Sequence, residues 1–161
     1  MELQNAYGIA PWFEGGLYFP LYSLTRNNGV TYNGVKVRAL FVTPDAVKRK
    51  FFYGLNFEFG INTAHWDERA YTSEIRPIIG AHLGRFDLVF NPIVDNSWRG
   101  FSKLNFLPVT RLAMAISETY RLALEEYDEF GPVSHFRRAS QQTHQLFGVI
   151  DINTPWIEFS N

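Results

Sequence analysis

The feature that most constrains this chain is an alternation of side chains over the twelve residues from Phe51 to Asn62. The odd positions are all apolar: Phe51, Tyr53, Leu55, Phe57, Phe59 and Ile61. After Phe52, the even positions carry only glycine, asparagine or glutamate. A period of two predicts a β-strand with one apolar face. Because most strands have about 5–6 residues and a tilted strand that crosses a membrane needs about 9–11, the length favours a membrane-crossing strand.

The same parity occurs at two earlier places in the chain. One apolar set is Phe13, Gly15, Leu17, Phe19 and Leu21, and another is Val35, Val37, Ala39 and Phe41, which alternate with Lys36 and Arg38. The composition agrees, because 15 Phe, 8 Tyr and 4 Trp make 17% of the 161 residues aromatic, and aromatic side chains favour strands. We therefore expect an all-β chain that forms a single domain over residues 1–161.

The overall composition excludes several classes of function. The formal net charge is −1, with 15 basic and 16 acidic residues, so there is no basic excess to bind nucleic acid or an anionic membrane surface. Without cysteine, the chain has no disulfide framework, thiolate zinc site or cysteine nucleophile. It also lacks a run of about 18 apolar residues. A membrane protein of this sequence would therefore have to be a β-barrel.

Residues 74–95 carry the sharpest local prediction. Apolar residues occupy odd positions in 75–83 and even positions in 86–94, with Gly84-Arg85 between them. This switch predicts a two-residue hairpin turn that pairs residues whose numbers sum to a constant. The predicted opposite pairs are Leu83–Phe86, His82–Asp87, Ala81–Leu88, Ile79–Phe90, Pro77–Pro92, Ile75–Val94 and Glu74–Asp95. Because two prolines at one level remove ladder donors, we expect a break or bulge there, which could shift the register beyond it.

The segment from Arg111 to Tyr127 fits two interpretations. Its apolar residues form a helical stripe, and Ala, Leu and Glu favour a helix. The alternative is two strands that turn at Ser117-Glu118-Thr119 and match Ile116 with Tyr120, Met114 with Leu122 and Leu112 with Leu124. A helix would leave neighbouring strands with unpaired edges in lipid, which costs several kcal/mol per backbone group. We therefore predict two strands, with Arg111 and Glu125 facing each other on the lumen side.

The predicted connections alternate in length along the chain. They cover about 24–34, 44–49, 63–73, 96–102 and 130–141, with tight turns at 84–85 and 117–119, and a final strand covers about 143–153. Tight turns at one rim and long loops at the other are typical of outer-membrane barrels. A soluble sandwich with Greek-key connections has no reason to keep this alternation.

Charges are predicted to lie almost entirely on the polar faces of these strands. The apolar faces of the seven strands before residue 130 carry one charge, Glu126, whereas the opposite faces carry seven acidic and six basic residues, among them Lys103, Arg121 and Glu129. The residues predicted to line a lumen are Glu14, Lys36, Arg38, Glu58, Glu74, Arg76, His82, Asp87, Asp95, Arg111 and Glu125. Parity alone does not say which face points inward, so a soluble barrel stays open as an alternative.

Two local groupings have side chains that could support chemistry. His65-Trp66-Asp67-Glu68 offers a histidine and two carboxylates, but its spacing suggests no further ligands, so we expect a solvated loop. His82 opposite Asp87 could handle a proton, but no serine is placed beside them to complete a triad, so we expect a hydrogen bond near the turn. There is no His-Glu-x-x-His, phosphate loop or nucleophile elbow. We expect no catalytic, cofactor-binding or metal-binding residue, no cofactor and no enzyme activity.

Aromatic residues near the predicted strand ends suit a girdle at a membrane interface. They are Trp12, Tyr18, Tyr22, Trp66, Tyr71, Trp98 and Trp156. Aromatic packing in the core of a soluble protein would account for them nearly as well.

Several blocks of the chain resemble a known family. They are Pro11–Tyr18 (PWFEGGLY), Phe52–Glu58 (FYGLNFE), Glu74–Gly80 (EIRPIIG), Asp87–Ile93 (DLVFNPI) and Gln142–Phe147 (QTHQLF). As a set they resemble uncharacterised, porin-like outer-membrane β-barrel proteins of proteobacteria over residues 10 to 152. The resemblance implies a secreted precursor and an antiparallel up-and-down barrel of the transmembrane type, with about eight strands in this chain. It also favours the two-strand interpretation of residues 111–127 and implies no enzyme activity.

The sequence departs from that family at both ends. It begins without a signal peptide, because residues 1–8 have neither a positive nor a long apolar region, and it ends at Phe159-Ser160-Asn161 without a strand that closes on a C-terminal aromatic residue. We therefore expect a barrel truncated at both ends, with an unclosed or irregularly closed sheet.

Three hypotheses for function follow. The first is a bacterial outer-membrane β-barrel in the lipid bilayer with a passive transport or envelope-structural role, in which small solutes would meet a lumen lined by balanced charges. The second is a soluble calycin-like barrel that binds an apolar small ligand against Phe51, Tyr53, Phe57 and Phe59. The weakest is a membrane-embedded hydrolase that uses His82 and Asp87, for which no nucleophile is found.

Overall fold

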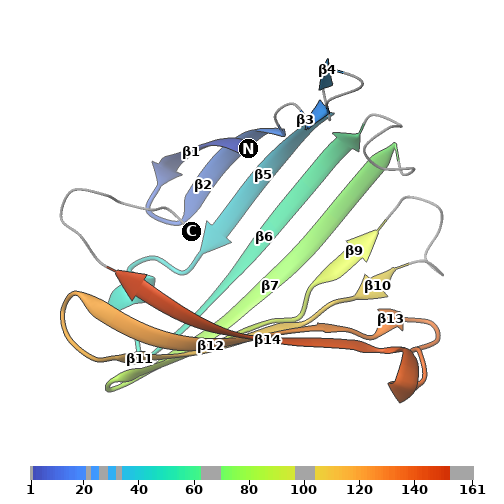
Figure 1. The fold of residues 1–161 in the computed structure, drawn as a ribbon. Coiled ribbons are helices and arrows are strands. Elements are labelled where there is room, and N and C mark those ends of the chain that lie inside the picture. The colour runs from blue at the N-terminus through green and yellow to red at the C-terminus, as the bar shows by residue number, and fades with distance from the viewer. Residues whose placement is uncertain are drawn as a thin grey trace.

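The chain folds into one large, curved antiparallel sheet (Figure 1). The computed structural model describes residues 2–20, 23–25, 29–31, 34–62, 70–96 and 104–152. In these ranges the only helices are the single-turn 3₁₀ helices η1 (Ala46–Lys48) and η3 (Ala139–Gln141). None of the helices in the described ranges has the length and apolar character needed to cross a membrane. The all-β prediction is therefore confirmed.

The main sheet contains twelve strands. Nine of them follow one another as a meander: β1 (Glu2–Ala10), β2 (Phe13–Pro20), β5 (Gly34–Val42), β6 (Phe51–Asn62), β7 (Tyr71–Leu83), β8 (Phe86–Asn91), β11 (Val109–Ala115), β12 (Tyr120–Glu129) and β14 (Thr143–Ile152). Short strands β9 (Val94–Asn96), β10 (Asn105–Phe106) and β13 (Gly131–Pro132) extend it at one end. A separate hairpin is formed by β3 (Ser23–Thr25) and β4 (Gly29–Thr31).

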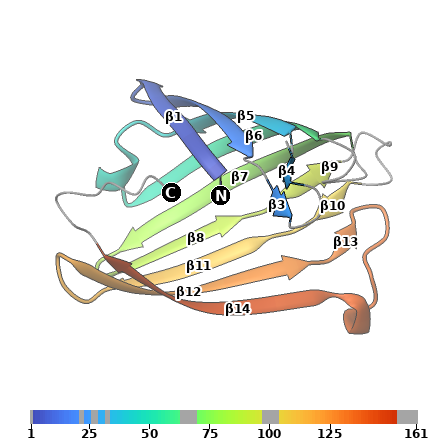
Figure 2. The same ribbon diagram turned by 45° about the horizontal axis from the view of Figure 1, so that its top comes forward.

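The sheet curls strongly but stays open between its two edges, β1 and β14 (Figures 1 and 2). The antiparallel up-and-down arrangement is as predicted, and so is an unclosed sheet. The count of about eight strands is too low. It missed β1, which pairs with β2 from Glu2↔Pro20 to Ala10↔Phe13, because Asn5 interrupts the apolar alternation of residues 2–10.

The long strand and the hairpin that follows it have the predicted boundaries and register. β6 covers Phe51–Asn62 without interruption. Gly84-Arg85 is a tight turn, and β7 and β8 pair Leu83 with Phe86 and Ile79 with Phe90. The ladder breaks at Pro92-Ile93, as the paired prolines led us to expect. The register does not shift, because Glu74 still faces Asp95 where β7 pairs with β9.

Residues 109–129 form two strands, as predicted against their helical propensity. β11 and β12 pair Leu112 with Leu124 and Met114 with Leu122. The turn between them is held by the Ser117 hydroxyl oxygen, which accepts hydrogen bonds from the backbone N–H groups of Thr119 and Tyr120 at 3.2 and 3.1 Å. On its other edge β11 pairs with β8. Non-local pairing on both edges of β11 therefore outweighs the local preference for a helix.

The connections separate onto two rims, as predicted. One rim carries the tight turns at 11–12 and 84–85, the turn at 116–119 and the segment with η1 at 43–50. Connections at the other rim are longer and include the β3–β4 hairpin, β13 and η3. In Figure 1 the compact turns lie at the left end of the sheet and the longer connections at the right.

A close contact between an aromatic ring and a glycine joins β6 to β7. Phe52 lies opposite Gly80 in the ladder, and its ring stacks on His82 with the ring centroids 5.0 Å apart. A Cβ atom on Gly80 would lie 2.0 Å from Cζ of Phe52. Only glycine therefore leaves room for the ring in this position.

Gly80→Ala is expected to lower the free energy of unfolding by about 1–3 kcal/mol, because the Phe52 ring must leave its stacked position. Gly148→Ala is the matched control, since no atom lies within 4 Å of the Cβ that this change would add, and we expect it to be neutral or slightly stabilising. Urea titration of the folded protein measures both. The Phe52→Leu/Gly80→Ala double variant should recover part of the loss. Equal effects of Gly80→Ala and Gly148→Ala would contradict this account.

Candidate functional site

The two faces of the sheet differ sharply in chemistry. On the apolar face of β6, Phe51, Tyr53, Leu55, Phe57 and Ile61 are 37–71% exposed, and Phe59 is half-buried. Large apolar side chains of neighbouring strands continue this exposed face: Leu17, Val37, Phe41, Ile75, Ile79, Leu83, Phe86, Leu88, Phe90, Leu112, Leu122, Leu124, Leu146 and Ile150. A surface of this extent is far larger than the apolar patches of ordinary soluble monomers.

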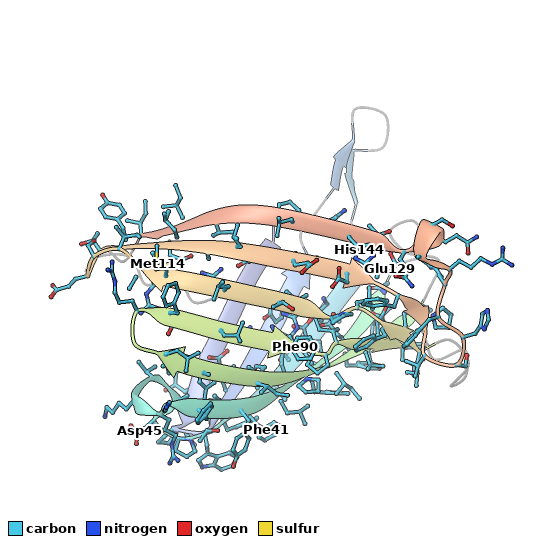
Figure 3. The ribbon with its side chains drawn as sticks, turned by 90° about the horizontal axis from the view of Figure 1, so that it is seen from below. Phe41, Asp45, Phe90, Met114, Glu129 and His144 are labelled. Carbon is cyan, nitrogen blue, oxygen red and sulfur yellow. The ribbon has the colours of Figure 1, made fainter. Side chains whose placement is uncertain are left out.

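The opposite, polar face is the more crowded one. Asn56, Ala113 and Ala123, which lie on this face, are only 3–5% exposed. Ion pairs on it join strands that are not neighbours in the sheet, as Arg111 does when it reaches Asp151 across β12. Converging side chains of this kind are expected on the concave side of a curved sheet. The side chains of both faces are drawn in Figure 3.

One group of charges on the polar face links β2, β5 and β6. Arg38 lies 3.2 Å from the Glu14 carboxylate and donates a hydrogen bond of 2.6 Å to the Tyr18 hydroxyl. Lys36 lies 3.1 Å from Glu58, and Glu58 also accepts a hydrogen bond of 3.1 Å from the Asn56 amide. Both basic side chains are therefore held by acceptors on the same face.

A second group spans β7, β8, β11, β12 and β14. Asp87 lies between two partners, with His82 Nδ1 2.6 Å from one carboxylate oxygen and Arg121 2.7 Å from the other. Arg111 pairs with both Glu125 and Asp151. Tyr127 donates a hydrogen bond of 2.9 Å to Glu125. Within β7, Arg76 pairs with Glu74 at 2.8 Å.

The residues predicted to line a lumen fall together on this polar face. Nine of them form the ion pairs described above: Glu14, Lys36, Arg38, Glu58, Glu74, Arg76, Asp87, Arg111 and Glu125. The tenth, His82, lies with Nδ1 2.6 Å from the Asp87 carboxylate. The eleventh, Asp95, lies opposite Glu74 as predicted. Arg111 and Glu125 face each other in the ladder. Asp151, Asn56 and Tyr127 also belong to this network. Alternation along the strands does not predict their membership, because it depends on which side chains the curvature of the sheet brings together.

Three of the aromatic residues predicted to form a girdle lie in the described part of the chain. Trp12 and Tyr71 are 51% and 52% exposed near strand ends. The assignment of Tyr18 to the girdle is wrong, because its side chain is 9% exposed and bonds Arg38 on the polar face. Tyr22, Trp66, Trp98 and Trp156 lie outside the described residues, as do Lys103 and the His65–Glu68 grouping.

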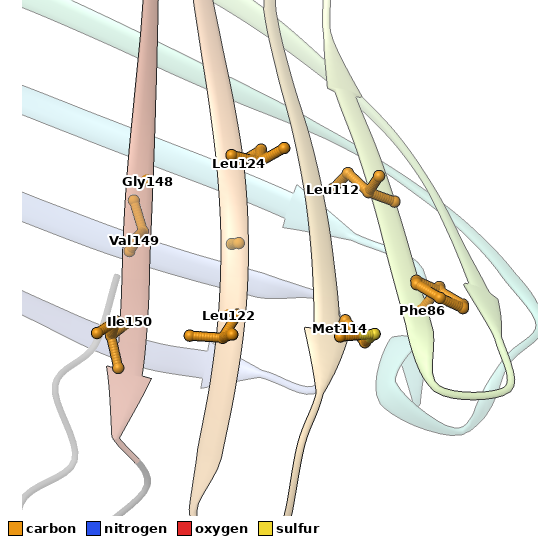
Figure 4. Close-up of a pocket in the computed structure, with 9 residues that line it drawn as sticks. Phe86, Leu112, Met114, Leu122, Leu124, Gly148, Val149 and Ile150 are labelled. Carbon is orange, nitrogen blue, oxygen red and sulfur yellow. The ribbon is translucent and has the colours of Figure 1, made fainter.

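A shallow groove of about 540 Å³ runs across β8, β11, β12 and β14 (Figure 4). Its lining is almost wholly apolar: Phe86, Leu112, Met114, Leu122, Ala123, Leu124, Gly148, Val149 and Ile150. Gly148 contributes no side chain to fill the space next to Leu124, its partner in the ladder. The groove lacks the convergent polar groups that orient a specific small ligand.

The two partners of Asp87 bear on the hydrolase hypothesis. Asp87 contacts His82 and Arg121. The third residue in this group is therefore an arginine, whereas a hydrolase triad would have a nucleophile there. Comparison with protein-family models, with curated proteins and with solved structures finds no match for this chain.

Proposed function

We propose that this chain is a bacterial outer-membrane β-barrel protein with a passive role in transport or in envelope structure. The observation that carries the proposal is the inverted distribution of side chains. Large apolar residues are exposed over one face, whereas most of the charged residues of the long strands are paired on the other. Lipid is the environment in which an apolar exterior and a polar interior are both stable. The lipid bilayer is thus the first partner that we propose.

The long strands support this placement. A tilted strand needs about 9–11 residues to cross the hydrocarbon core, and β5, β6, β7, β12 and β14 have 9, 12, 13, 10 and 10 residues. Short connections at one rim and longer ones at the other are also typical of these proteins. The resemblance of the sequence blocks to porin-like proteins points to the same location.

The pairing of charges bears on the passive role. Nine of the predicted lumen residues have an ion-pair partner of opposite sign, so a lumen lined by this face would have little net field to select ions by charge. Three buried polar atoms, Arg38 Nε, Asn56 Oδ1 and Asn91 Oδ1, have no hydrogen-bond partner among the described residues. Water is the usual partner of such atoms. We therefore propose a narrow, hydrated lumen crossed by ion pairs, open at most to small solutes, and no enzyme activity.

The alternative, a soluble calycin-like barrel, would enclose the same apolar side chains around a ligand. It is less well supported, because Phe51 and Tyr53 are 67% and 71% exposed. The apolar groove likewise lies on the exposed apolar face of an unclosed sheet and not inside a closed barrel.

The proposal predicts that the chain folds only with an amphiphile. Full-length protein is unfolded in urea and diluted into buffer, into detergent micelles or into phosphatidylcholine vesicles, and strand content is followed by circular dichroism and protection by protease digestion. We expect a cooperative, protease-resistant fold in micelles and vesicles and aggregation in buffer, because the apolar face cannot be hydrated at low cost.

A sedimentation measurement on each sample separates folding from aggregation. A monodisperse, cooperatively unfolding protein in buffer without amphiphile would overturn the membrane proposal. Enhanced fluorescence of an apolar dye bound to that soluble form would favour the calycin-like alternative.

A further inference from the structure

Three potential metal ligands lie together on the apolar face, at one end of β12 and β14. Glu126 and Asp128 are two residues apart on β12, so they share a face, and Asp128 lies opposite His144 on β14. Figure 3 shows His144 at the end of the sheet where β12 and β14 approach η3. The prediction that Glu126 is the single charge on the apolar faces is therefore wrong, because Asp128 lies on the same face of β12.

The ligand atoms of the three side chains converge. One carboxylate oxygen of Glu126, one of Asp128 and a ring nitrogen of His144 all lie within 4.8 Å of one another. His144 Nδ1 lies 2.6 Å from Asp128 Oδ1, and its ring meets the edge of Phe130 at a centroid distance of 5.9 Å and an interplanar angle of 83°. The imidazole is therefore oriented from two sides.

The charge of this group is incompletely balanced. Asp128 has His144 as its partner, whereas the Glu126 carboxylate has no hydrogen-bond or ion-pair partner among the described residues. Arg121, which precedes the two carboxylates on β12, is engaged 2.7 Å from Asp87, and Arg137 is engaged 2.7 Å from Glu129. Two carboxylates and one imidazole thus carry net negative charge next to a face lined by Leu124, Leu146 and Ile150. Like charges this close favour the uptake of a cation.

We propose that Glu126, Asp128 and His144 bind a divalent transition-metal ion of the zinc type. An imidazole with two carboxylates suits Zn²⁺ and its neighbours better than Mg²⁺ or Ca²⁺, which prefer all-oxygen sites. The ion takes the place of the proton between His144 Nδ1 and Asp128 Oδ1, and the exposed Glu126 side chain turns toward it. Three protein ligands leave a fourth position for water. Because the ligands come from β12 and from β14, the ion fastens an edge strand of the sheet.

The test is a titration of the full chain with Zn²⁺ alone, under the conditions in which it folds, followed by calorimetry. Replacement by Co²⁺ adds visible absorption bands that report coordination by nitrogen and oxygen. We expect one ion per chain, with Mg²⁺ and Ca²⁺ unable to compete at equal concentration. We also expect the urea midpoint of the folded protein to rise with added Zn²⁺, because an ion that binds only the folded state stabilises it.

Variants locate the site. Glu126→Gln and His144→Gln should each weaken Zn²⁺ binding by about tenfold or more. Loss of even a residue that only hydrogen-bonds to a metal ligand lowers metal affinity by about 10–100-fold. His135→Gln is the matched control, because it removes an exposed histidine from the turn after β13 and should leave the affinity unchanged. Circular dichroism checks that each variant is folded.

Two results would overturn the proposal. One is the absence of saturable Zn²⁺ binding by the folded chain. The other is binding that survives both Glu126→Gln and His144→Gln but is lost in His65→Gln, which would move the ion to the His65–Glu68 segment. Neither result depends on whether the chain spans a membrane, so the metal site and the proposed function succeed or fail separately.

Discussion

Ile79→Arg is expected to lower the free energy of unfolding in vesicles by about 2–4 kcal/mol, whereas Leu83→Arg is expected to lower it by about 0–1 kcal/mol. Both residues lie on the apolar face of β7 and are exposed, at 56% and 46%. They differ in position, since Ile79 lies well inside β7 and Leu83 is its last residue, beside the tight turn. If β7 crosses a bilayer, Ile79 lies deeper in the hydrocarbon than Leu83, and the free-energy cost of an arginine rises with that depth. In water the two positions would not differ in this way.

The measurement is urea unfolding of the wild-type chain and the two variants in phosphatidylcholine vesicles. The pair controls for the substitution itself, because strand, face and introduced residue are the same. If the apolar face met water, both changes would be surface substitutions with effects within about 0.5 kcal/mol. Equal and small losses at the two positions would therefore contradict the membrane placement.

Arg111→Met is expected to lower the free energy of unfolding by about 3 kcal/mol, because it leaves Glu125 and Asp151 without their shared partner. The Arg111 side chain is only 23% exposed, so water compensates for little of this loss. Lys48→Met is the matched control. Its partner Asp45 is 3.3 Å away, but the two side chains are 81% and 67% exposed, and such surface pairs contribute about 0–1 kcal/mol.

The same urea titration provides a rescue experiment for this network. A triple variant, Arg111→Met with Glu125→Gln and Asp151→Asn, removes all three charges and should recover most of the stability, because no buried charge is left without a partner. If the triple variant is less stable than Arg111→Met alone, the rescue fails. Glu125 and Asp151 would then stabilise the fold through contacts other than their ion pairs with Arg111.

Parity in the sequence was sufficient to predict most strands and their faces. The switch of apolar positions across Gly84-Arg85 gave the register of β7 and β8 correctly, since a tight turn leaves only one pairing that keeps apolar residues on one face. Segment 111–127 shows where local pattern fails. Its residues suit a helix as well as two strands, and only the pairing of β11 with β8 decides between them.

The polar face could be predicted as a set but not as a network. Alternation places Arg111, Glu125 and Asp87 on one side of the sheet. It does not place Asp151 beside Arg111, because those residues lie on strands separated by β12. Contacts of this kind depend on how strongly the sheet curls. Tyr18 was misassigned for a related reason, since its position near a strand end gave no sign that its hydroxyl would meet Arg38.

The directions of the two edge strands limit how the sheet can be sealed. Eight antiparallel ladders separate β1 from β14, and an even number of reversals makes these two strands run the same way. A seam formed by β1 directly against β14 would be a parallel ladder, with slanted hydrogen bonds, in an otherwise antiparallel cylinder. If an odd number of antiparallel strands is inserted between β14 and β1, both edge strands have antiparallel neighbours. If the number is even, zero included, one of the new ladders is parallel.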